Sequence, residues 1–149
     1  MKTLYIVLEG ILVKTVSGQD IPTGIYDMEL NWTTIDWICK QDFTNIVILS
    51  NQTWIYGGKG VRNGERFYSK IKYVSECIRE SLEKSGKLVE VSFSYSIRKP
   101  WIHGLDDSGP DLIKSVGLDP TGSIFLCRPI PFDLDYAKLY PGIQVITKI

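Results

Sequence analysis

The sequence has little of what marks a secreted or membrane-spanning protein. Its three cysteines, Cys39, Cys77 and Cys127, are far apart and form no Cys-x-x-Cys pair, which predicts reduced thiols in a cytoplasmic protein. No apolar run approaches the roughly 20 residues of a membrane-spanning helix, and Glu9 follows too early for a signal peptide. The one histidine, His103, excludes a metal site built from several histidines, and we expect it to be structural.

The sequence also has no excess of charge of either sign. Seventeen Lys and Arg balance seventeen Asp and Glu, which argues against a protein held to nucleic acid or membranes by a global positive field. The balance conceals one basic stretch, interrupted by a single acid, Glu65. Its members are Lys59, Arg62, Arg66, Lys70 and Lys72. The stretch is either a solvated helix face or a track for a nucleic-acid backbone.

What is present is typical of one globular domain. The 149 residues are 44% hydrophobic, enough to bury a core without disulfides, and we expect a single domain over 1–149. The hydrophobic patterns predict strands at 4–8, 45–49, 89–95, 123–127 and 143–147, with helices starting at Thr33 and covering 67–82 and 108–116. This alternation predicts a mostly parallel α/β sheet with helices on both faces.

Ligands of parallel α/β sheets bind outside the carboxyl ends of the strands. The segments to examine for chemistry are therefore 9–12, 50–60, 96–101 and 127–135. A turn-rich excursion at about 11–32, broken by Ser17-Gly18 and Pro22-Thr23-Gly24, lies between the first strand and the first helix.

Read in order, these segments resemble the haloacid dehalogenase (HAD) superfamily, and more narrowly the 3′-phosphatase domain of polynucleotide kinase/phosphatase. Residues 6–13, Ile-Val-Leu-Glu-Gly-Ile-Leu-Val, are similar to a strand that ends in Asp-x-Asp-Gly-Thr-Leu. Residues 14–24 resemble the flap that follows it, and Ser50-Asn51-Gln52 resembles the second motif. Arg98-Lys99-Pro100 matches the third, and residues 117–126 resemble the approach to the fourth.

The resemblance implies a HAD-like Rossmannoid fold with a flap at 11–32 and no large cap domain. It also implies that the first aspartate of motif one is the nucleophile and the second is the general acid and base. In this chain Val7 takes the nucleophile position and Glu9 takes the acid/base position. An isopropyl group cannot attack phosphorus, so the family's covalent route is closed at Val7.

The remaining motifs imply a phosphate site without its metal. Ser50, Asn51, Arg98 and Lys99 are the expected phosphate-binding residues, with Ser50 and Lys99 also at catalytic positions of the family. The fourth motif normally supplies Gly-Asp to hold Mg²⁺, and here Cys127-Arg128 stands in its place. We therefore expect no cofactor, with Mg²⁺ required only if the chain is active.

Arg128 has two interpretations. Its guanidinium could take the place of the cation, so that phosphate binds without metal. Alternatively, Arg128 points to solvent or pairs with Asp133 or Asp135.

Three further residues near the strand ends each have an ordinary and a functional interpretation. Trp54 and Trp101 follow motifs two and three, and they either pack beneath loops or stack on bases. Cys127 is either a buried small hydrophobe or a reactive thiol.

The sequence therefore favours a catalytically inactive HAD-like protein that binds a phosphorylated ligand, such as a nucleic-acid end. One alternative is an active phosphomonoesterase that uses Glu9. Another is a scaffold with a vestigial pocket whose partner is a protein or a second copy of the chain.

Overall fold

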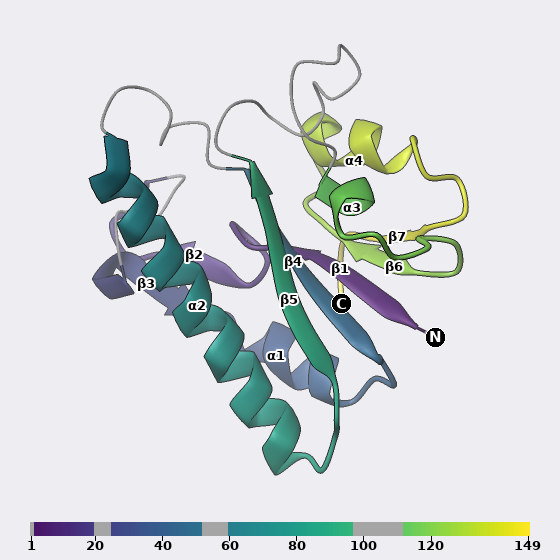
Figure 1. The fold of residues 1–149 in the computed structure, drawn as a ribbon, viewed down its shortest axis with the longest axis horizontal. Helices are drawn as coiled ribbons and strands as arrows, with labels where there is room; N and C mark the ends of the chain where they lie inside the picture. Colours follow the sequence, from purple (N-terminus) through teal and green to yellow (C-terminus); the bar gives the residue numbers. More distant parts are fainter. Residues whose placement is uncertain (1, 20–24, 52–59, 97–111) are drawn as a thin grey trace.

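A five-stranded parallel sheet forms the centre of the molecule (Figure 1). The computed structural model describes residues 2–19, 25–51, 60–96 and 112–149. The strand order is β5-β4-β1-β6-β7, and every neighbouring pair in this sheet is parallel. The strands are β1 (Thr3–Val7), β4 (Asn45–Asn51), β5 (Glu90–Ser96), β6 (Ile124–Leu126) and β7 (Gln144–Ile146). The predicted parallel sheet is confirmed.

Helices cover both faces of this sheet, as predicted. They are α1 (Trp32–Cys39), α2 (Gly60–Lys84), α3 (Leu112–Ser115) and α4 (Pro131–Ala137). One apolar cluster joins the sheet to α1 and α2, and a second joins it to α3 and α4. None of these helices has an apolar stretch long enough to cross a membrane, within the residues described.

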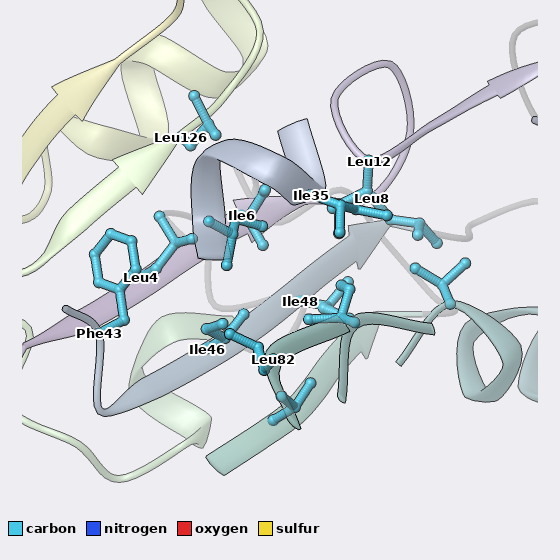
Figure 2. Close-up of a cluster of buried hydrophobic side chains, with 14 of the residues drawn as sticks. Leu4, Ile6, Leu8, Leu12, Ile35, Phe43, Ile46, Ile48, Leu82 and Leu126 are labelled. Atoms are coloured by element: carbon cyan, nitrogen blue, oxygen red, sulfur yellow. The ribbon is translucent and has the colours of Figure 1, made fainter. Parts of the chain in front are cut away.

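The central strand β1 supplies side chains to both clusters. Leu4 and Ile6 belong to the cluster shared with α1 and α2, which Figure 2 shows. Tyr5 and Val7 belong to the opposite cluster. Because consecutive strand residues point to opposite faces, the continuous apolar run of β1 buries both faces of the sheet. Burying each such side chain stabilises the fold by about 1.5–3 kcal/mol.

A small hairpin occupies part of the predicted flap. It consists of β2 (Val13–Thr15) paired antiparallel with β3 (Met28–Leu30). The short helix η1 (Ile25–Asp27) lies between the two strands in sequence and leads directly into β3. The backbone N–H and the hydroxyl of Ser17 both donate to the Asp27 carboxylate, at 2.7 and 2.8 Å. The described residues between β1 and α1 therefore form a hairpin and no larger cap.

Several boundaries differ from the sequence-based predictions. The first helix begins at Trp32, because Asn31 is its cap and accepts from the Thr34 N–H at 3.4 Å. α2 begins at Gly60, ahead of the apolar periodicity. Within 108–116 the description starts at residue 112, and α4 was not predicted because seven residues are too few to show a helical period.

A tight turn after β1 reverses the chain at Gly10, which has a φ of 83°. A Cβ at this position would lie 3.2 Å from Arg128 Cδ, whereas a Cβ at Gly18, with a φ of 81°, meets nothing within 4 Å. The two glycines therefore share the backbone requirement and differ only in the neighbouring side chain.

We expect Gly18→Ala to cost about 1 kcal/mol of stability, because alanine is strained at positive φ. Gly10→Ala should cost more, since it also displaces Arg128. Urea unfolding of the two variants checks the difference. Equal losses would contradict the close packing of Gly10 against Arg128.

Candidate functional site

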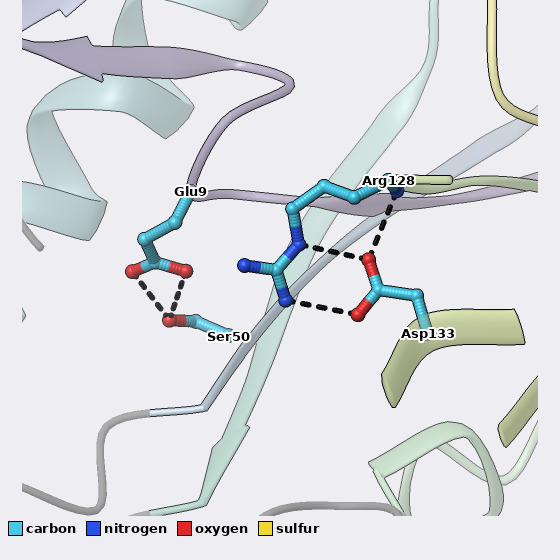
Figure 3. Close-up of polar contacts among 4 residues, drawn as sticks. All are labelled: Glu9, Ser50, Arg128 and Asp133. Atoms are coloured by element: carbon cyan, nitrogen blue, oxygen red, sulfur yellow. Dashed lines mark hydrogen bonds and ion pairs between the residues drawn. The ribbon is translucent and has the colours of Figure 1, made fainter. Parts of the chain in front are cut away.

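Side chains that follow three neighbouring strands meet at the carboxyl edge of the sheet (Figure 3). Glu9 follows β1, Ser50 is the second-to-last residue of β4, and Arg128 follows β6. The sequence predicted this convergence of motifs one, two and four from the carboxyl ends of parallel strands. In the described residues the structure brings these three side chains together.

Glu9 is buried, with 7% of its surface exposed. The Ser50 hydroxyl lies 2.9 Å from Oε1 and 3.1 Å from Oε2 of Glu9, so it donates to this carboxylate. Burial raises the pKa of Glu9 above its ordinary value, and the positive charge of Lys70 and the Ser50 hydrogen bond oppose this rise. The site therefore holds the Glu9 proton more tightly than water would.

Arg128 binds Asp133 with a planar, two-pronged contact. Nε donates to Oδ2 and Nη2 donates to Oδ1, both at 2.9 Å, and the Arg128 backbone N–H also donates to Oδ2 at 2.9 Å. Asp133 is fully buried. Of the alternatives left open by the sequence, the structure has the pairing with Asp133, while Asp135 pairs with Lys138 at the surface.

The guanidinium of Arg128 also acts on Glu9. In Figure 3 its third nitrogen is directed toward the Glu9 carboxylate rather than toward Asp133. The charge of Arg128 lowers the pKa of Glu9, although less strongly than Lys70 does. Arg128 thus stands between two buried carboxyl groups.

Val7, at the position where the resembling family has its nucleophile, lies in the apolar core. Its side chain is fully buried in a cluster with Val47, Leu49 and Phe125. No reactive group therefore occupies this position.

A divalent cation does not fit the side chains of this site. Magnesium prefers oxygen ligands, but both oxygens of Asp133 already accept from Arg128, whose cationic guanidinium lies beside Glu9. Among the described residues, no group of three or more His, Cys, Asp or Glu side chains could hold a metal ion. We derive no chemistry from a metal here.

Among the described basic side chains of the stretch, Lys70 does not lie where the sequence analysis expected it. Both alternatives, a solvated helix face and a nucleic-acid track, require an exposed side chain, but only 1% of the surface of Lys70 is exposed, and it interacts electrostatically with Glu9 and Asp27. Lys72 is exposed, as a surface track requires. The apolar stripe of α2 held a signal, because position 70 is four residues before Val74 and three after Phe67. No sequence pattern indicated Asp27.

The remaining candidates are not tested by the structure. The described residues do not include Trp54, Lys59, Arg98, Lys99, Trp101 and His103. The structure describes only the backbone, and not the side chains, of Asn51, Arg62 and Arg66. The roles predicted for these residues stay predictions.

Cys127 has the environment of an unreactive thiol. It is fully buried, and burial together with the charge of Asp133 raises the pKa of its thiol to about 12. Because the thiolate is the reactive form, the interpretation as a small buried hydrophobe is favoured. All three cysteines are free.

Comparisons with known proteins agree on the fold. No family model and no curated protein matches the sequence. The D,D-heptose 1,7-bisphosphate phosphatase of B. bronchiseptica, solved with magnesium and phosphate, is similar in structure, with a TM-score of 0.62 and 13% identity over 99% of this chain and 93% of that one. A protein from Mesorhizobium loti assigned as a HAD-like phosphatase has a TM-score of 0.60 and 20% identity over 96% of this chain and 69% of that one. The chain thus has the fold of HAD-like phosphatases.

The Arg128–Asp133 pair should be worth far more than the exposed pair beside it. Arg128→Met removes the charge partner of a buried carboxylate, which keeps only the backbone N–H of residue 128, and should cost about 3 kcal/mol. Lys138→Met, which breaks the surface pair with Asp135, should cost about 0.5 kcal/mol or less. Urea denaturation of both variants measures the difference. Similar losses for the two would show that the Arg128 contact contributes little.

Stability should fall as pH rises through the range in which Glu9 ionises. The folded state raises the pKa of Glu9 above its ordinary 4.5, so its stabilising contribution is full below that value and is lost as pH rises through the raised pKa. Glu9→Gln removes this titration. Unfolding free energies measured from acid to neutral pH should therefore converge at low pH and favour the glutamine variant at higher pH, and a constant difference would refute the assignment.

Proposed function

We propose that this chain binds a terminal phosphate, such as that of a nucleic-acid 3′ end, and does not hydrolyse it. The observation that carries the proposal is Val7, a fully buried aliphatic side chain where the resembling family has its nucleophilic aspartate.

The groups near Val7 do not replace the missing nucleophile. Attack on phosphorus by the family's route needs an ionised carboxylate that forms an acyl phosphate. Both described carboxyl groups at the site are already engaged, because Asp133 accepts from Arg128 and the buried Glu9, whose pKa is raised by burial, accepts from Ser50. Neither is therefore as available for attack as an exposed, ionised carboxylate.

The positively charged groups at the strand ends support phosphate as the ligand. Arg128 commits two guanidinium nitrogens to Asp133, and the third is directed into the site. Guanidinium groups bind phosphate through charge-assisted hydrogen bonds. Arg98 and Lys99, which follow β5 in the sequence, would add two positive charges. The B. bronchiseptica phosphatase was solved with magnesium and phosphate. By analogy of fold, we infer that this chain binds phosphate at the carboxyl edge of the sheet, without magnesium.

The small flap and the basic stretch support a phosphate that belongs to a macromolecule. The described residues between β1 and α1 form only a hairpin. Because the described part of this segment forms no larger cap, we infer that the site admits a phosphate at the end of a long molecule. The exposed Lys72 and the sequence positions Lys59, Arg62 and Arg66 could contact the backbone of a nucleic acid.

Phosphate release from 3′-phosphorylated DNA and RNA oligonucleotides tests the absence of hydrolysis. We expect no turnover with or without Mg²⁺. A double variant, Val7→Asp with Arg128→Asp, reintroduces the family's acidic residues, so turnover gained by this variant alone would assign the loss to these two positions. Wild-type turnover that Glu9→Gln abolishes would refute the proposal and establish an active phosphomonoesterase.

Fluorescence anisotropy with matched 3′-phosphate and 3′-hydroxyl oligonucleotides tests binding. We expect the 3′-phosphate to bind at least about tenfold more tightly, corresponding to one charge-assisted contact, and EDTA to leave this preference unchanged. Lys99→Met should reduce the preference, while the control Lys138→Met should not. Loss of binding on chelation would contradict a metal-free site, and absence of both binding and turnover would favour a protein scaffold.

A further inference from the structure

A lysine lies in the interior of the protein beside the site. Lys70, in the middle of α2, has 1% of its surface exposed. Lysine is almost never fully buried unless it is paired, because removing its ammonium group from water is costly. The reason for its burial is therefore to be sought among the charges around it.

Two carboxyl groups from different parts of the chain interact electrostatically with this lysine. Glu9 belongs to the site at the end of β1, and Asp27 ends η1 in the hairpin. Both are buried, at 7% and 8% exposure, and both interact electrostatically with Lys70. Helix α2 also packs against η1.

At the end of the hairpin away from α1, Asp27 accepts hydrogen bonds from the residues that follow β2. The Ser17 N–H and hydroxyl donate to the Asp27 carboxylate, and the Val16 N–H donates to the Asp27 carbonyl oxygen at 3.0 Å. The near end is held separately, because the Asn31 N–H donates to the Leu12 carbonyl oxygen and the Thr34 hydroxyl donates to that of Ile11. Asp27 thus links the hairpin electrostatically to Lys70 of α2.

We propose that Lys70 is a positioning residue that docks the hairpin strands β2 and β3, through η1, on the site, by sharing one ammonium group between Asp27 and Glu9. The charge at Glu9 and the position of the hairpin are then coupled through Lys70. Because the three groups are buried together, loss of one leaves the others poorly compensated. The coupling needs neither ligand nor metal.

Hydrogen exchange of the free protein tests the docking. In Lys70→Met we expect the Val16 amide and the β2 and β3 amides to exchange at least about tenfold faster, while the β1 and β4 amides keep their protection. Lys70→Arg, which retains the charge, should restore most of the protection. Lys72→Met is the matched control, because Lys72 is an exposed lysine two residues along the same helix, and it should leave the hairpin unchanged.

A second variant and a spectroscopic readout separate charge sharing from simple space filling. Asp27→Asn removes only the hairpin's carboxylate, and it decides the question if Lys70→Met does not fold. We expect faster hairpin exchange in Asp27→Asn, and a lower pKa of Glu9 by carboxyl NMR, because Lys70 then serves Glu9 alone. Where Lys70→Met folds, it should raise the pKa of Glu9.

Two results would overturn the proposal. One is hairpin exchange in Asp27→Asn that equals the wild-type rate. The other is a Glu9 titration that is unmoved by the loss of either partner. If Lys70→Arg opened the hairpin as fully as Lys70→Met, packing of the aliphatic chain rather than the shared charge would explain the burial.

Discussion

Pairing of buried charges at the carboxyl edge of the sheet is the constraint on which the site depends. Glu9 and Asp133 are removed from water by the elements that bury the core, and each carboxyl group needs a donor or a cation within reach. Arg128 donates to Asp133, Ser50 donates to Glu9, and the positive charge of Lys70 stabilises the ionised form of Glu9. Five segments distant in sequence, β1, β4, α2, β6 and α4, thereby acquire one fixed arrangement.

The same constraint separates this site from a magnesium-dependent one on the same fold. A divalent cation would need carboxylate oxygens, but here a guanidinium group carries the positive charge and occupies those of Asp133. A covalently attached cation neither dissociates nor ligates a substrate oxygen as a metal does, although it can still donate hydrogen bonds to an anion. The fold of HAD-like phosphatases is therefore present here with a guanidinium group, and no fitting cation site, beside Glu9 in the described residues.

The fold depends on the apolar run of β1, whereas the site depends on the residues at the end of this strand. Leu4, Tyr5 and Ile6 of β1 bury both faces of the sheet, whatever follows the strand. Val7 extends this apolar run into the position at which the family that the sequence resembles has its nucleophile, and its side chain is buried in the core. Stability and chemistry meet at this one residue.

The sequence by itself determined the parallel sheet, the helices on its two faces and the convergence of Glu9, Ser50 and Arg128, because hydrophobic period and strand order are local patterns that fix which ends lie together. It did not choose between solvent, Asp133 and Asp135 as the partner of Arg128. It also placed Lys70 on the surface and gave no sign of Asp27. Only the tertiary structure decided these pairings, because burial and the distance between charges depend on which elements pack together, and no local pattern records that.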